Sequence, residues 1–158
     1  MSCLCPDLLG IHSVRHPSLL SKMGVKDLPD HIYNWMVNYF EHRGHITRHQ
    51  GKESSFAEIN ASVVQGSVVG PTSFVVVASD LHTLYSSNML MKYADDSYLL
   101  VGSNHIATAS EEFKHITIWA RANNLRLNPS KTKELIVLKN RIRHVLPQAS
   151  SIISVAES

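Results

Sequence analysis

The sequence predicts an α+β fold in which an antiparallel sheet is backed by helices on one face. Pairs of short apolar segments with turn residues between them indicate β-hairpins at 45–63 and 88–102. Segments with apolar residues at helical spacing, 30–42 and 103–124, lie before and after these hairpins. A chain of 158 residues with 44% hydrophobic content is one ordinary domain that can bury a core.

The first part of the chain is expected to hold two helices and a hairpin. Pro17 fits the first turn of a helix, because its missing N–H costs nothing there. Asp30 can cap the next helix, and Gly24 and Gly44 end the two helices. The expected elements are an irregular remnant over 1–12, helices over 16–23 and 30–42, and strands over 45–50 and 55–63 around a turn at 51–53.

The second part alternates apolar segments with one long amphipathic helix. Residues 74–81 are apolar nearly all round and are expected to be buried, and their β-branched side chains favour a strand on propensity alone. The runs 88–93 and 97–102 form a hairpin with buried apolar side chains. We further expect a long helix that is capped by Ser103 or Asn104 and ends near Asn123 and Asn124. Its apolar side comprises Ile106, Phe113, Ile116, Ile118 and Trp119, and Glu111, Glu112 and Lys114 face outward. A strand over 134–138 and a flexible tail over 141–158 follow.

Charge is unevenly distributed along the chain. The formal net charge of +2 is too small to indicate a nucleic-acid partner by itself. A basic stripe with one acidic residue, Glu134, comprises Arg121, Arg126, Lys131, Lys133, Lys139, Arg141 and Arg143. Such a stripe can pair with phosphates, and a solvated helix end and loop explains it equally well.

The cysteines and the apolar runs indicate the cellular compartment in which the protein is expected. Cys3 and Cys5 are too close for an easy internal disulfide, so a reducing compartment is expected. With His12 and His16 they give a spacing that is poor for a structural zinc finger. The longest apolar run, 74–78, is too short to span a bilayer, and no secretory signal precedes it. We therefore expect an intracellular protein of the cytoplasm or nucleus that is neither secreted nor inserted into a membrane.

Two adjacent carboxylates, Asp95 and Asp96, stand at the turn of the second hairpin. Acids held rigidly can bind divalent metal through hard oxygen ligands, and two metals about 4 Å apart can clamp an in-line phosphoryl displacement. Aspartate is also a common turn residue that simply points into water. The surrounding sequence decides between these readings.

Three blocks, in this order and spacing, carry a resemblance to a known family. They are 65–74 (QGSVVGPTSF), 93–96 (YADD) and 125–133 (LRLNPSKTK), with the outer two each about thirty residues from the acids. Together they resemble motifs B, C and D of reverse transcriptases, specifically those of non-LTR retrotransposons. The resemblance extends over roughly residues 13–140.

The resemblance implies a partial palm domain over 13–140 without full fingers and thumb. It also implies a helix opened by Gly70 and Pro71 where propensity favours a strand. The family's reaction is RNA-templated DNA synthesis, a nucleotidyl transfer assisted by two Mg²⁺ ions. The implied partners are an RNA template, a DNA primer and deoxynucleoside triphosphates, and neither a membrane nor a protein partner is inferred.

Roles carry over residue by residue to the matching motifs. Asp95 is the implied catalytic metal ligand, and Asp96 is a supporting or second ligand. The remaining implied substrate-binding residues are Tyr93 and Ala94 beneath the primer end and nucleotide, Gln65 and Gly66 where nucleotide and template pass, and Lys131 near the leaving pyrophosphate. Lys133 is an equal candidate for the role of Lys131.

The resemblance fails at motif A. An aromatic–Asp pair of that motif corresponds to Ile11 and His12, and its catalytic Asp corresponds to Pro6. Asp7 is one residue off, and on a strand such a slip turns the side chain to the opposite face. We therefore expect the isolated chain to be inactive as a polymerase. The alternatives are a non-catalytic nucleic-acid-binding remnant and an inert fragment of a retrotransposon reading frame.

Overall fold

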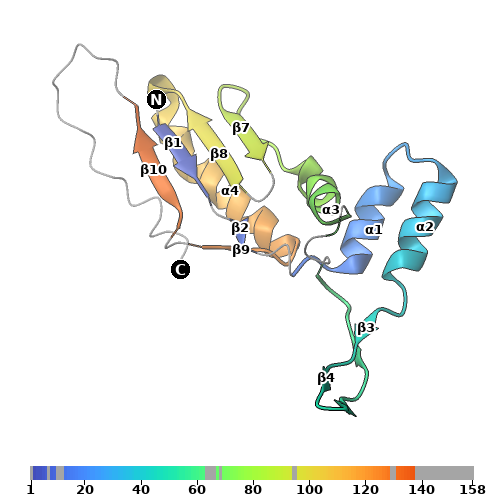
Figure 1. Ribbon diagram of the computed structural model, residues 1–158. Helices are drawn as coiled ribbons and strands as arrows, with labels where there is room; N and C mark the ends of the chain where they lie inside the picture. Colours follow the sequence, from blue (N-terminus) through green and yellow to red (C-terminus); the bar gives the residue numbers. More distant parts are fainter. Residues whose placement is uncertain are drawn as a thin grey trace. The chain divides into compact units, whose positions relative to one another are not determined.

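The computed structural model describes residues 2–6, 8–9, 13–62, 67, 69–93, 96–128 and 131–137. The chain divides into two compact units, Met1–Gly10 with Asp80–Ser158, called here the sheet unit, and Ile11–Ser79, called the helical unit. The predicted domain over 13–140 therefore contains parts of both units. Helices and small antiparallel sheets make up the described residues, which confirms the α+β class (Figure 1).

A four-stranded antiparallel sheet is the centre of the sheet unit. Its strand order is β10-β1-β8-β7, with β1 Ser2–Cys5, β7 Met89–Tyr93, β8 Asp96–Val101 and β10 Lys133–Ile136 (Figure 1). A separate short pair joins β2 Leu8–Leu9 to β9 Arg126–Leu127. β10 confirms the strand predicted over 134–138, as far as the described residues reach.

The sequence had predicted irregular structure over 1–12, and this prediction is wrong, because β1 and β2 lie there. β1 is an inner strand that pairs with β8 through Leu4 and Leu99 and with β10 through Leu4 and Glu134. The two partners lie about 95 and 130 residues away in the sequence, so no local pattern reports the pairing. A strand of this length also shows too few alternations for a period to be recognised.

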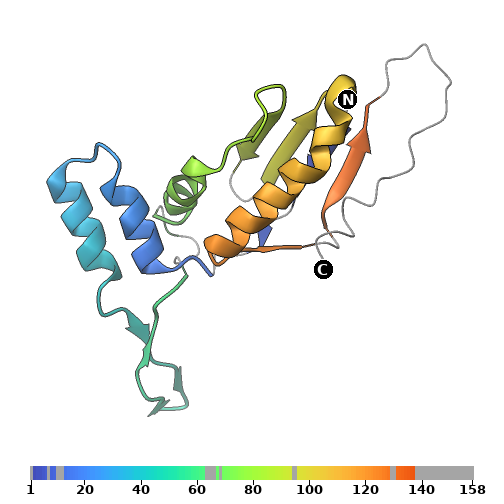
Figure 2. The same cartoon turned by 180° about the vertical axis from the view of Figure 1, so that it is seen from behind.

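One face of the sheet is covered by α4 Ala109–Ala122, the orange helix that crosses it in Figure 2. Phe113, Ile116 and Trp119 are buried as predicted. The prediction of burial is wrong for Ile118, which is 56% exposed. Two residues beyond Ile116 turn an α-helix by about 200°, which takes Ile118 to the solvent side.

The start of the long helix also differs from the prediction. Ser103–Thr108 form a 3₁₀ helix, η2, with no side-chain cap, and Ile106 in this turn is 45% exposed. A 3₁₀ turn has a different periodicity from α4, so its residues do not continue the buried stripe. The predicted end is confirmed, because Asn124 adopts a left-handed φ of 59° and the Leu125 N–H reaches the Ala120 carbonyl at 2.8 Å.

Glu112 was expected outside but is fully buried. Its Oε1 accepts hydrogen bonds from the Tyr85 N–H and the Asn88 amide, and its Oε2 accepts one from the Leu84 N–H, all at 2.9 Å. The Trp119 indole N–H likewise donates to Asp80 at 3.0 Å. Position 112 falls on the buried stripe of α4, and the backbone donors of the loop before β7 make a carboxylate acceptable there.

The helical unit contains the predicted helices. They are α1 His16–Gly24, α2 Asp30–Phe40 and α3 Val69–Val77, which a 3₁₀ turn, η1 Ala78–Asp80, follows. α3 confirms the helix that the resemblance implied, but Val75 is 62% exposed, so this helix is not buried all round. Asp30 begins α2 without capping it, because Pro29 is the cap residue and no side-chain bond forms.

Gly44 had been expected to end α2, but the end of this helix does not depend on it. The helix stops at Phe40, and His42 then takes a positive φ of 50°. Gly44 instead begins the hairpin, where a Cβ atom would lie 2.6 Å from the Ala57 carbonyl oxygen. A larger residue would therefore collide with the opposite strand.

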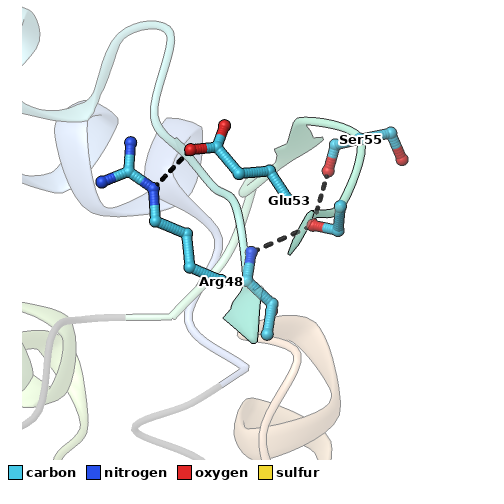
Figure 3. A network of polar contacts seen from close by, with 5 residues as sticks. Arg48, Glu53 and Ser55 are labelled. Carbon is cyan, nitrogen blue, oxygen red and sulfur yellow. Dashed lines mark hydrogen bonds and ion pairs between the residues drawn. The ribbon is translucent and has the colours of Figure 1, made fainter. Parts of the chain in front are cut away.

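The first hairpin is confirmed as two short ladders, β3 Gly44–His45 with β6 Ala57–Glu58 and β4 Arg48–His49 with β5 Lys52–Glu53. The turn is not at 51–53 but at Gln50 and Gly51, whose φ angles of 47° and 76° are those of a two-residue hairpin turn. Figure 3 shows Arg48 paired with Glu53 across the ladder at 2.7 Å. Both side chains are largely exposed, so the pair contributes little stability.

Across the described ranges, no helix has the length and apolar character needed to cross a membrane.

The buried Glu112 gives the first prediction. Glu112→Gln keeps the shape but replaces one acceptor oxygen with an N–H₂ group that faces other donors. We expect a loss of about 1–3 kcal/mol in the free energy of unfolding, measured by urea denaturation. The matched control is Glu111→Gln on the exposed side of the same turn, with a change within about 0.5 kcal/mol. Equal costs for the two variants would contradict the role assigned to Glu112.

Candidate functional site

The acidic hairpin is confirmed as β7 and β8. Tyr93 and Asp96 are the last described pair, so the ladder runs up to a two-residue connection. Ala94 and Asp95 form that connection and lie outside the described residues, as do Gln65 and Gly66. Their implied roles remain predictions.

The side chains beside the turn are divided between two faces of the sheet. Leu99 and Val101 of β8 are buried, as predicted, and Ser97 is buried with them. The prediction of burial is wrong for β7, where Met89 is 58% and Met91 46% exposed. β7 is an edge strand, and these methionines pair with β8 residues that alternate with the buried ones.

The face opposite the buried β8 residues is called here the open face. Residues directly paired between antiparallel strands share a face, so the register identifies its members. They are Cys3, Cys5, Met89, Met91, Tyr93, Asp96, Tyr98, Leu100, Lys133 and Leu135. Most are exposed, including Tyr93 at 79% and Leu135 at 58%. A surface of aromatic, thioether and basic groups therefore surrounds the acidic turn.

The residue at the implied motif A position is Pro6. β1 runs antiparallel to β8, with Leu4 opposite Leu99, so the carboxyl end of β1 points toward the end of β8 that begins with Asp96. Pro6 directly follows β1 and its side chain is fully buried. This end of β1 therefore carries an apolar ring without a ligand atom. Asp7 lies outside the described residues.

Sequence reasoning from periodicity missed β1 as part of the site. The signal that could have found it was the resemblance itself, because placing a motif A acid at Pro6 requires a strand directly before it. The short run Cys3 to Cys5 is that strand.

The described residues do not fit a two-metal centre. Within them, no group of three or more His, Cys, Asp or Glu side chains is placed to hold a metal ion. Asp96 is exposed at the turn, and the buried Pro6 offers no oxygen from the side of β1. Two closely spaced divalent ions need carboxylates from more than one side.

The described part of the basic stripe is accessible. Arg121 lies in the last turn of α4, Arg126 lies in β9 and Lys133 begins β10, and each is exposed, as is Lys131. Lys133 belongs to the open face through its pairing with Cys5. Lys139, Arg141 and Arg143 lie outside the described residues.

Comparison with known proteins gives a consistent family. The profile described as Reverse transcriptase (RNA-dependent DNA polymerase) matches residues 10–151. The RNA-directed DNA polymerase from mobile element jockey of Drosophila melanogaster is 34% identical over 129 residues, which are 75% of this chain and 14% of that protein. Probable RNA-directed DNA polymerases from transposon BS and transposon X-element of the same species are 32% and 29% identical, over 75% and 72% of this chain. The chain spans 14% of the length of each of these relatives.

The inner strand of the site gives a prediction about pH. Burial, followed by the contact with Cys5, raises the pKa of the Cys3 thiol from 9.0 to about 11. In a Cys5→Ser variant, which leaves one thiol and removes the contribution of Cys5, burial still raises the pKa of Cys3, so we expect alkylation by iodoacetamide at pH 8 to be slower in the folded chain than in urea. The rate in the folded chain should climb as the pH rises, since the thiolate reacts. Equal rates with and without urea would show that Cys3 is not buried.

Proposed function

Because the chain belongs to the reverse transcriptase (RNA-dependent DNA polymerase) family, we propose that it is a palm segment of an RNA-directed DNA polymerase of the non-LTR retrotransposon type. The observation that supports this most is the position of β1. It lies between β8 and β10 with its carboxyl end toward the acidic turn, as the relation of motif A to motif C requires. α4 on the opposite face completes a sheet backed by a helix (Figure 2).

The open face is the proposed surface for primer and template. Tyr93 is exposed beside the turn and offers an aromatic ring on which a base can stack. Together with Ala94 it would support the primer end and the incoming deoxynucleoside triphosphate. Gln65 and Gly66 would contact nucleotide and template, as the family resemblance implies.

Phosphate binding is assigned to the basic residues near β10. Lys131 and Lys133 both remain candidates for the position near the leaving pyrophosphate. Lys133 is favoured by its place on the open face, on the same side of the sheet as Asp96. A cation on that face can pair with a phosphate that lies across it.

The proposed chemistry of the intact family, nucleotidyl transfer with Mg²⁺, depends on acids that this chain only partly supplies. Asp95 and Asp96 are the proposed metal ligands and catalytic residues. Pro6 replaces the acid that would face them from β1. We therefore propose that this chain does not catalyse polymerisation by itself, since it cannot fix two divalent ions by carboxylates from both sides.

A second candidate function is nucleic-acid binding without catalysis. It is favoured by the exposed Arg121, Arg126, Lys131 and Lys133, whose charges need no intact metal centre to pair with phosphates. The two candidates predict the same surface, and neither predicts turnover by this chain alone.

Primer extension tests the proposed loss of catalysis. Purified chain is mixed with a labelled DNA primer on an RNA template, deoxynucleoside triphosphates, and Mg²⁺ or Mn²⁺. We expect no extension above that of an Asp95→Ala variant, because one side of the metal centre is lacking. Extension by the native chain that disappears in the variant would refute the proposal and point to Asp7 or another acid.

Salt-dependent binding tests the phosphate surface. Lys131→Ala with Lys133→Ala should weaken binding to a labelled primer–template and lower the slope of log K against log salt by about two units. The matched control is Lys26→Ala with Lys114→Ala, which removes the same charge from exposed positions outside the stripe. Equal effects of the two double variants in a fluorescence titration would show that only net charge matters.

A further inference from the structure

A cavity of about 450 Å³ lies within the helical unit. The start of α1, the end of α2 and the segment around β6 line it, and all the described residues in its lining belong to this unit. Cavities of about 300–1,000 Å³ are typical of small-molecule sites. The described lining shares no residue with the open face or with the basic stripe, so neither proposed function uses this cavity.

One side of the cavity is apolar. Pro17 and Leu20 of α1 and Phe40 of α2 contribute to it, and the Phe40 ring packs on the His16 ring with centroids 4.5 Å apart. Phe40 and His16 are each only 5% exposed, so their surroundings hold both rings in place. A planar ligand can pack against side chains that are already fixed at little cost in conformational entropy.

One ring nitrogen of the buried His16 is left for a ligand. Its Nε2 lies 2.8 Å from the Ser62 carbonyl, which can only accept, so Nε2 carries the hydrogen and Nδ1 of the neutral ring is an acceptor. Among the described residues Nδ1 has no hydrogen-bond partner, and it is not one of the polar atoms that lack both a partner and solvent contact. Nδ1 is therefore reached from the cavity that His16 lines, where it can accept an N–H.

Charged groups of both signs line the same cavity. Glu41, Glu58 and Arg15 are exposed, and none of them forms an ion pair with another described residue. The two carboxylates and the His16 Nδ1 need N–H donors, whereas the Arg15 guanidinium needs an acceptor. A simple cation would satisfy the carboxylates but not Arg15, and a simple anion would do the reverse. The lining therefore fits a planar, uncharged ligand that has donors on one edge and acceptors on another.

We propose that this cavity binds a single guanine base. Guanine has N–H donors at N1 and N2 on one edge, where a carboxylate can accept both, and acceptors O6 and N7 on the other, where arginine donates. Its ring packs against the apolar side of the cavity, as an unstacked base does in RNA-binding proteins. Uracil has no amino group, and adenine and cytosine place an acceptor beside theirs. Guanine alone among the four offers a carboxylate two neighbouring donors.

Nucleoside titration tests the proposal. Guanosine, adenosine, cytidine and uridine are titrated separately into the purified chain by isothermal titration calorimetry. We expect guanosine to bind at one site per chain and about tenfold more tightly than the other three, as a bidentate base contact discriminates. Nucleosides carry no phosphate, so this result does not depend on the phosphate surface assigned to Lys131 and Lys133.

Three results of this titration would overturn the proposal. They are equal affinity for the four nucleosides, no binding of guanosine at millimolar concentration, and tighter binding of N-acetylarginine amide than of guanosine. The last result would show that the carboxylates select a cation and that Arg15 does not take part.

Charge-removing variants assign the site to the cavity. Glu41→Gln with Glu58→Gln keeps the side-chain shapes, and we expect it to weaken guanosine binding by about tenfold, because the paired acceptors are lost. The matched control is Asp27→Asn with Glu53→Gln, which removes the same charge from exposed positions of the same unit outside the cavity. Both double variants replace exposed side chains, so their circular dichroism should match that of the native chain. Guanosine affinity that falls equally in both variants, or in neither, would contradict the proposal.

The source of the base is identified by two further comparisons. The single-stranded RNA UUGU is compared with UUUU, and guanosine triphosphate with uridine triphosphate, so that the phosphates within each pair are equal. A preference for UUGU places the guanine in an RNA strand, and a preference for guanosine triphosphate places it in a free nucleotide. Neither preference is expected in the variant with Glu41→Gln and Glu58→Gln. A native chain without a preference in either comparison would overturn the proposal.

Discussion

The pairing of β1 on both of its edges is the constraint on which the sheet unit depends. The β7–β8 hairpin and β10 do not pair with each other, and β1 supplies the hydrogen bonds between them. The same pairing brings the carboxyl end of β1 toward the acidic turn. Fold and site therefore rest on one strand of four residues. A change that weakens β1 would separate β10, which carries Lys133, from the hairpin that carries Asp96.

A second constraint is the buried acceptor on α4. The loop before β7 has backbone N–H groups that would otherwise be buried without partners, and Glu112 satisfies two of them together with the Asn88 amide. Because Asn88 directly precedes β7, these bonds fix the start of the strand whose other end is Tyr93. The helix thus positions the hairpin through hydrogen bonds as well as through apolar packing, and it does so from the side of the sheet opposite the open face.

The parts of the fold with strong local patterns could be predicted from the sequence. Helical spacing gave α2 and α4, and two apolar runs around adjacent acids gave the β7–β8 hairpin. β1 could not be predicted from a local pattern, because its partners are distant in sequence. Glu112 was predicted to face solvent because it is charged. Its burial is explained by the hydrogen-bond donors of the loop before β7. The candidate site was predicted from motif order and spacing rather than from any one residue, and by the same resemblance Pro6 corresponds to the acid of motif A.

The position of β1 also governs the order in which the protein can assemble during synthesis. β1 precedes β8 and β10, the strands on its two sides, by about 95 and 130 residues in the chain. The helical unit is one continuous stretch, Ile11–Ser79, and can form while the rest is still being made. The sheet has to wait until residue 136 has emerged, so its closure is a late, non-local event. Until then both edges of β1 lack these partners, and unpaired strand edges can pair with other chains.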